Sequence, residues 1–138
     1  MTDTRTLTEM MHSTMPLSAH LNIEATEFTP EKVVLQLQWA DHLCTSNGLL
    51  HGGTVMALAD SAGGASAFLN LPEGASGTAT IESKTNFLGG VTAGTVIATA
   101  RPLHKGSTTI VVETEVTNND RLVAKVTQTQ AVLRQQTP

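Results

Sequence analysis

The chain has 138 residues, of which 40% are hydrophobic and 14% are charged. A chain of this length fits one compact domain, which we predict over residues 1–138, and its apolar content excludes an intrinsically disordered protein. Eight Lys and Arg side chains stand against twelve Asp and Glu, for a net charge of −4. Such a charge offers no attraction to phosphate backbones or anionic lipids, so we expect no nucleic-acid partner and no membrane partner.

Cysteine content and the N-terminal segment limit which cellular compartment and which cofactors we expect. Cys44 is the single cysteine, so it has no internal disulfide partner, and no cysteine–histidine cluster has metal-ligand spacing. Residues 1–16 lack the basic start and apolar stretch of a signal peptide, and no segment approaches the roughly 18 apolar residues of a membrane span. We therefore expect a cytoplasmic protein without a metal or other cofactor.

The first half of the chain is predicted to form a short amphipathic helix, two strands, a loop and one long helix. In chain order these elements cover Thr6–Met15, Leu21–Phe28, Val33–Trp39, Asp41–Gly48 and Gly52–Asn70. Leu7, Met10 and Met11 share one side of the short helix, which we expect Pro16 to end. Alternation of apolar and polar residues and an intervening turn predict that the two strands form a hairpin.

The second half of the chain is rich in Thr, Val and Ile, which favour strands. Four long strands are predicted, over Thr78–Leu88, Thr95–Leu103, Thr108–Thr117 and Leu122–Arg134. Short segments that contain Gly or Asn separate them, which predicts tight turns. Together the elements predict an α+β fold of the hotdog type, in which a curved antiparallel sheet of about six strands wraps one long central helix.

Asp60 is the only charged residue between His51 and Glu73, in the middle of the predicted long helix. An isolated carboxylate in an apolar helix costs free energy to bury, so it is solvated, paired or kept for chemistry. The residues one turn away are all uncharged: Met56, Ala57, Gly63 and Gly64. These uncharged neighbours favour a pocket that Asp60 lines. A solvated carboxylate or a local hydrogen-bonding role for Asp60 remains the alternative.

Two pairs of glycines mark the same helix. Gly63 and Gly64 each cost about 1 kcal/mol relative to Ala in mid-helix, which indicates close approach of the sheet or of a ligand. Gly52 and Gly53 begin the helix, where unpaired N–H groups and the positive end of the helix dipole favour an oxygen that carries negative charge. An oxyanion hole is one interpretation, and a simple loop-to-helix turn is the other.

The run from Gly48 to Gly53, with Asp60 nine positions after His51, resembles the signature of hotdog thioesterases of the phenylacetate-degradation (PaaI-like) group. The resemblance covers essentially the whole chain. It implies that the Gly52 N–H binds the thioester carbonyl and that Asp60 acts as nucleophile or general base. It also implies that Thr80, on the strand after the helix, assists Asp60, although Thr is also simply common in strands. We expect His51 to fix the loop.

The sequence departs from this family at one position. Family members commonly carry Asn or Gln six residues before the His, where this chain has Thr45, so orientation of the carbonyl or the water falls to Thr45 or to Asn47. The resemblance further implies that basic residues near the cleft contact coenzyme A phosphates, although solubility is the alternative role for such residues. The remaining candidates for substrate contact are Gly53, Met56, Gly64, Lys84, Arg101 and Lys105.

The spacing of Gly52 and Asp60 constrains any site that uses both. They are eight residues apart, which is about 12 Å along one helix axis. One chain cannot easily bring both to one carbonyl, so we predict a site shared across a two-fold homodimer, in agreement with what the resemblance implies. We expect such dimers to assemble into a homotetramer. Cys44 with His42 as its base is a weaker candidate nucleophile.

The expected function is hydrolysis of an acyl-CoA thioester by water. Two alternatives stay open, a module that binds acyl-CoA without cleaving it and a hotdog dehydratase that acts on hydroxyacyl thioesters. The dehydratase requires a His–acid pair for proton transfer, and the spacing of Asp60 from His51 favours hydrolysis. The sequence does not identify the acyl group, although the small residues around Asp60 indicate room for a bulky one.

Overall fold

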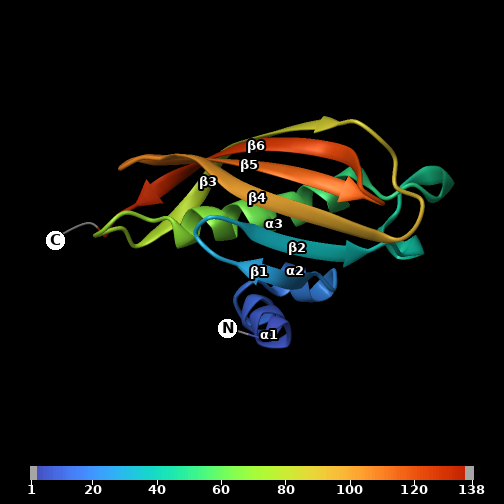
Figure 1. The fold of residues 1–138 in the computed structure, drawn as a ribbon, viewed down its shortest axis with the longest axis horizontal. Coiled ribbons are helices and arrows are strands. Elements are labelled where there is room, and N and C mark those ends of the chain that lie inside the picture. Colours follow the sequence, from blue (N-terminus) through green and yellow to red (C-terminus); the bar gives the residue numbers. More distant parts are fainter. Residues whose placement is uncertain (1–2, 136–138) are drawn as a thin grey trace.

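The computed structural model describes residues 3–135, in which a six-stranded antiparallel sheet curves over the long helix α3, Gly52–Leu69 (Figure 1). The strands lie in the order β1-β2-β4-β5-β6-β3. Their bounds are β1 Glu24–Phe28, β2 Val33–Gln38, β3 Gly77–Phe87, β4 Thr95–Lys105, β5 Thr109–Asn118 and β6 Arg121–Leu133. The predicted hotdog fold, with about six strands and a central helix, is confirmed.

Strand connections differ from the prediction at one place. The β4–β5 and β5–β6 connections are tight hairpins, as expected, but β3 pairs with β6 and not with β4. The segment that contains Gly89 and Gly90 is therefore a crossover between opposite parts of the sheet, and the predicted tight turn there is wrong. Four strands of similar composition do not specify their partners, and β3 is left as an edge strand with one paired side.

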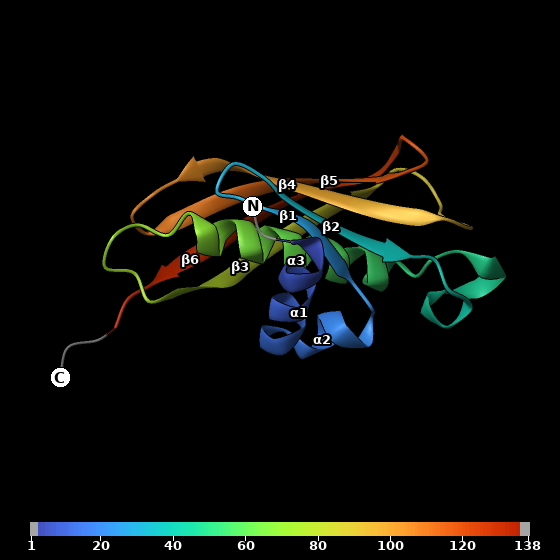
Figure 2. The same ribbon diagram turned by 60° about the horizontal axis from the view of Figure 1, so that its bottom comes forward.

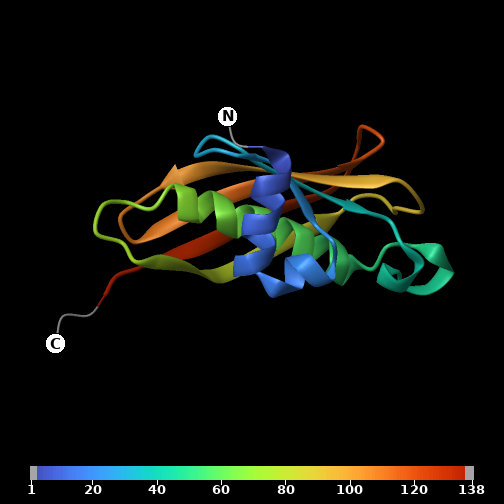
Figure 3. The same ribbon diagram turned by 90° about the horizontal axis from the view of Figure 1, so that it is seen from below.

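The N-terminal elements are helix α1, Thr4–Thr14, and helix α2, Pro16–His20. Pro16 starts a second helix as well as ending the first, because proline is tolerated in the first turn, where its missing N–H is not needed. β1 begins later than predicted, because Asn22 turns the chain with a φ of 56°. Figures 2 and 3 show α1 and α2 on the open side of the sheet, where α1 crosses α3.

The core lies between α3 and the concave face of the sheet. Alternate residues of each strand point to this face, and its buried apolar side chains include Leu35, Val96, Ala98, Ile110, Val112 and Val126. From α3 the fully buried apolar side chains are Leu58, Ala59, Ala62 and Ala67. Within residues 3–135, no helix is long and apolar enough to cross a membrane.

Candidate active site

The N-terminus of α3 leaves one backbone donor free. His51 is the N-cap, and its Nδ1 accepts a hydrogen bond of 2.8 Å from the Gly53 N–H. The His51 carbonyl accepts from the N–H groups of Thr54 and Val55. In the described part of the chain the Gly52 N–H has no hydrogen-bond partner, so it is the donor that remains for a ligand oxygen at the positive end of the helix dipole.

Both glycines of this turn lie close to a neighbouring side chain. A Cβ on Gly52 would lie 3.1 Å from Cζ of Phe87, and one on Gly53 would lie 2.9 Å from His51 Nδ1. The first glycine thus lies under an aromatic ring of β3, and the second lets the His51 ring fold back as a cap. The predicted substrate contact at Gly53 cannot use its N–H, because His51 already accepts it.

The loop before α3 holds Thr45 and Asn47, both exposed at the Gly52 end of the helix. Trp39 anchors this loop through a 3.0 Å hydrogen bond from its Nε1 to the Gly48 carbonyl. Asn47 has a φ of 63° and Gly48 a φ of 71°, a left-handed pair that turns the chain tightly. No hydrogen bond joins the side chain of Thr45 or Asn47 to another group between residues 3 and 135, so both side chains face solvent.

Asp60 lies in the middle of α3 with an exposed side chain that the sheet holds from two strands. Its Oδ1 accepts hydrogen bonds from Thr80 Oγ1 of β3, at 3.4 Å, and from Gln128 Nε2 of β6, at 3.2 Å. The ion pairs found among residues 3–135 do not include Asp60, so neutral groups alone hold its charge. The predicted contact between Thr80 and Asp60 is present.

Two consecutive hydrogen bonds, from Thr78 to Gln130 and from Gln130 to Thr80, orient the Thr80 side chain. Thr78 Oγ1 donates to Gln130 Oε1 at 2.9 Å, and Gln130 Nε2 donates to Thr80 Oγ1 at 2.6 Å. Because the Thr80 oxygen accepts from Gln130, its own hydroxyl proton is free to point at Asp60. Thr80 is therefore oriented as a donor to the carboxylate.

Sequence analysis did not single out Gln128 and Gln130, which are fully buried on the concave face. A signal was available, since both share the strand face of Val126 by the period of two. A buried amide must find hydrogen-bond partners, and two such amides on a core-facing strand indicate a polar group opposite them.

Within one chain these residues form two separate groups. Thr45, Asn47, His51 and Gly52 surround the start of α3, whereas Asp60, Thr80, Gln128 and Gln130 lie around its middle. The structure does not bring Gly52 and Asp60 together, because the straight run of α3 separates them by about 12 Å.

An apolar cavity of about 580 Å³ adjoins the Asp60 group. We call it the α1 cavity, because it lies between α1, the second half of α3 and the start of β3. Its polar lining residues are Thr14, Thr78, Thr80 and Gln130, and its apolar lining includes Met10, Met11, Met15, Phe28, Phe68 and Leu69. A cavity of this size and character suits an apolar group whose polar end reaches Thr80.

Gly63 and Gly64, in the middle of α3, have different surroundings. A Cβ at Gly64 would meet nothing within 4 Å, and Gly64 lines the α1 cavity. A Cβ at Gly63 would coincide with the side-chain amide of Gln128. Met56 is exposed and lies outside the residues that line this cavity.

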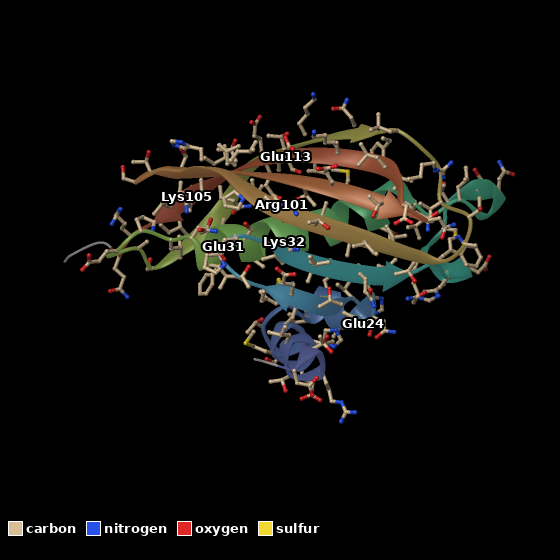
Figure 4. The ribbon with its side chains drawn as sticks, in the orientation of Figure 1. Glu24, Glu31, Lys32, Arg101, Lys105 and Glu113 are labelled. Carbon is tan, nitrogen blue, oxygen red and sulfur yellow. The ribbon has the colours of Figure 1, made fainter. Side chains whose placement is uncertain are left out.

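The basic candidates lie away from Asp60 in a single chain. Lys84 and Arg101 are on the outer face of the sheet, because each is in register with an outward residue, Thr127 or Glu113. Figure 4 shows Arg101 near the middle of β4 and Lys105 toward the end of that strand. Contact of these side chains with coenzyme A phosphates stays a prediction.

Cys44 is a poor nucleophile where it stands. Its thiol donates to the Ala40 carbonyl at 3.4 Å, and desolvation by burial, then the negative charge of Asp41, raise the pKa of the Cys44 thiol. Because the thiolate is the reactive form, this environment disfavours attack by Cys44. Among residues 3–135, no three His, Cys, Asp or Glu side chains converge as a metal site.

Known proteins resemble this chain over much of its length. The thioesterase superfamily matches residues 47–125, a segment that contains both His51 and Asp60. A Bacillus subtilis protein named "Putative esterase ComA2" is 34% identical over 115 residues, which cover 83% of this chain and 91% of that protein.

Solved structures share the fold. A thioesterase family protein from Silicibacter pomeroyi is 27% identical with a TM-score of 0.84, over 93% of this chain and 96% of that one. The PaaI protein of Escherichia coli, from the phenylacetic acid degradation operon, has the same fold at 22% identity and a TM-score of 0.81, over 91% and 89% of the two chains. The chain belongs to the thioesterase superfamily and is a thioester hydrolase with the hotdog fold.

Proposed function

We propose that the protein hydrolyses acyl-CoA thioesters at sites shared between two copies of the chain. One observation carries the proposal: the Asp60 carboxylate has no cationic partner among residues 3–135, and neutral donors hold it beside the polar part of the α1 cavity. A carboxylate in this position is available to take a proton or to attack a carbonyl carbon.

In this mechanism the apolar acyl group occupies the α1 cavity and the thioester lies near Asp60. The Gly52 N–H of the second copy donates to the carbonyl oxygen and stabilises the developing oxyanion by about 3 kcal/mol. Asp60 either takes a proton from the attacking water or attacks the carbonyl carbon itself. When Asp60 acts as the base, the carbon–sulfur bond then breaks, the free acid is released, and the coenzyme A thiolate takes the proton that Asp60 holds. When Asp60 attacks, the thiolate leaves as a mixed anhydride forms, and water then hydrolyses this anhydride, which frees the acid and the Asp60 carboxylate and supplies the proton of the thiol.

The other candidates receive supporting roles. His51 acts as a cap that keeps the Gly52 N–H in place, because its Nδ1 accepts the neighbouring Gly53 N–H. Thr45 or Asn47 of the second copy orients the water or the carbonyl. Lys84, Arg101 and Lys105 are proposed contacts for the coenzyme A phosphates, and the exposed Met56 is a proposed contact for the substrate.

The edge strand β3 supports the dimer. It is 11 residues long, pairs with β6 on one side, and exposes Ile81 and Phe87, and the exposed Leu88 follows it directly. A long edge with exposed apolar side chains is a template for pairing with another strand. Two-fold pairing of two β3 edges makes the two α3 helices antiparallel, so that Gly52 of each copy approaches Asp60 of the other. Association of two such dimers gives the expected tetramer.

A panel of acyl-CoA substrates, assayed by the thiol they release, tests the proposal. We expect hydrolysis of at least one aliphatic or aromatic acyl-CoA without added metal, at a rate that EDTA leaves unchanged. Acyl-pantetheine and acyl-carrier-protein thioesters serve as comparisons, because they share the thioester and differ in the carrier. Stoichiometric binding of acyl-CoA without thiol release, or activity on the other carriers alone, contradicts the proposal.

Filling the α1 cavity is expected to select against long acyl groups. Gly64→Leu places a side chain in open space, so the fold is kept while the cavity shrinks. We expect kcat/KM for a medium-chain acyl-CoA to fall by at least about tenfold and that for acetyl-CoA to change little. The matched control is Gly64→Ala, which adds one methyl group and favours the helix by up to about 1 kcal/mol. Equal losses for both chain lengths would show that the acyl group lies elsewhere.

A further inference from the structure

Gln128 is a fully buried amide whose two ends have different surroundings. Its Nε2 donates to Asp60 Oδ1 at 3.2 Å, across the interface between β6 and α3. Its Oε1 is buried and has no hydrogen-bond partner in the described residues. A buried acceptor without a partner destabilises a protein, so its presence here calls for a role outside stability.

The helix is adapted to admit this amide. A Cβ at Gly63 would coincide with the Gln128 amide oxygen and would lie 3.2 Å from its nitrogen. Glycine in mid-helix lowers stability relative to alanine. Two features that each cost stability, the amide oxygen without a partner and Gly63, therefore lie against each other. Both belong to the placement of the side chain that donates to Asp60.

The two donors to Asp60 reach the same oxygen. Thr80 and Gln128 both donate to Oδ1, from two different strands, and Oδ2 has no hydrogen-bond partner in the part of the chain described. A carboxylate on an exposed helix face otherwise rotates among several rotamers. Two donors on one oxygen select one orientation and leave the other oxygen open.

We propose that Gln128 is a positioning residue, which Gly63 admits to the helix and which holds Asp60 so that Oδ2 faces the reacting thioester or water. This inference rests on the proposed role of Asp60. It assigns Oδ2 as the atom that accepts the proton from water or forms the bond to the carbonyl carbon. Gln128 itself touches neither substrate nor water in this account.

Gln128→Met tests the proposal, because methionine has a similar length and lacks both the amide donor and the orphan acceptor. We expect kcat to fall about tenfold or more, since a small misplacement of a reacting group is costly, while KM stays within about twofold. The melting temperature is expected to stay equal or to rise. A purely structural role for Gln128 predicts that the melting temperature and kcat fall together. The expected combination therefore distinguishes positioning from structural support.

Two further variants keep the test decisive. Gln128→Asn fits the same space and withdraws the amide from Asp60 by one methylene group, so it should show the same fall in kcat. Thr114→Val is the matched control, because Thr114 is fully buried on β5 and its hydroxyl also lacks a partner among residues 3–135. We expect Thr114→Val to keep kcat and the melting temperature.

Parallel measurement of Asp60→Asn separates the two proposals. If Asp60→Asn is inactive while Gln128→Met and Gln128→Asn keep wild-type kcat, positioning by Gln128 is overturned and the proposed function stands. A fall in kcat that accompanies a large loss of melting temperature in both Gln128 variants also overturns it. Near wild-type activity of Asp60→Asn removes Asp60 from the mechanism, and with it positioning by Gln128, whereas absence of acyl-CoA hydrolysis by the wild type overturns the proposed function itself.

Discussion

Asp60→Asn is expected to lower kcat for acyl-CoA hydrolysis by about 100-fold or more, with little change in substrate affinity. The asparagine oxygen can still accept hydrogen bonds from Thr80 and Gln128, so the side chain keeps its place. What the variant loses is the negative charge and the basic oxygen. Steady-state kinetics and a binding assay with the same acyl-CoA measure the two effects separately.

Asp60→Glu is the companion variant for this position. It keeps the charge and moves the carboxylate by one methylene group, so we expect partial activity between the wild type and the Asn variant. An Asn variant with near wild-type kcat would assign Asp60 to structure, where it acts as a local acceptor for the two strands.

Mixed dimers are expected to recover activity from two inactive parents. Gly52→Pro deletes the oxyanion donor, and the backbone suits it, because His51 has a φ of −62° and a ψ of 135°, values favourable before proline. We expect this homodimer and the Asp60→Asn homodimer to lose about 100-fold or more of the activity. A mixed dimer combines both lesions in one site and leaves the other site intact. Random mixing should therefore recover up to about a quarter of wild-type activity per total site.

Gly52→Ala is the control for the proline variant. Its Cβ would also lie 3.1 Å from the Phe87 ring, but the N–H remains, so the difference between the two variants isolates the donor. Verified mixed dimers without activity above their parents would show that Gly52 and Asp60 do not serve a shared site. One of the two would then be removed from the mechanism.

Local sequence patterns predicted the elements that have a clear period or composition. The long helix was expected over Gly52–Asn70 and covers Gly52–Leu69, because its Ala, Leu and Met residues favour a helix and turn residues flank it. The hairpin of β1 and β2 was also expected, although β1 begins three residues later than predicted, at Glu24. Boundaries moved where single residues decide the backbone, as at Asn22 and Pro16.

Strand pairing could not be read from the same patterns. The strand after the helix pairs with the last strand of the chain, and its connection to β4 is a crossover. Alternation of residues predicts which side chains share a face, but it does not say which strand lies beside which. Pairing depends on how the sheet covers α3, which is a property of the whole fold.

The sequence by itself determined that Asp60 is the lone carboxylate of an apolar helix and that His51, Gly52 and Gly53 begin it, because charge, spacing and glycine content are local properties. The tertiary structure alone decided that Gly53 serves the His51 cap while the Gly52 N–H stays free. It also decided that Gln128 reaches Asp60 through the space left by Gly63. The His51 cap is a local contact whose geometry depends on the conformation of the turn, whereas the contact of Gln128 with Asp60 joins residues far apart in the chain. Its geometry follows from packing one strand against one helix, which no local pattern encodes.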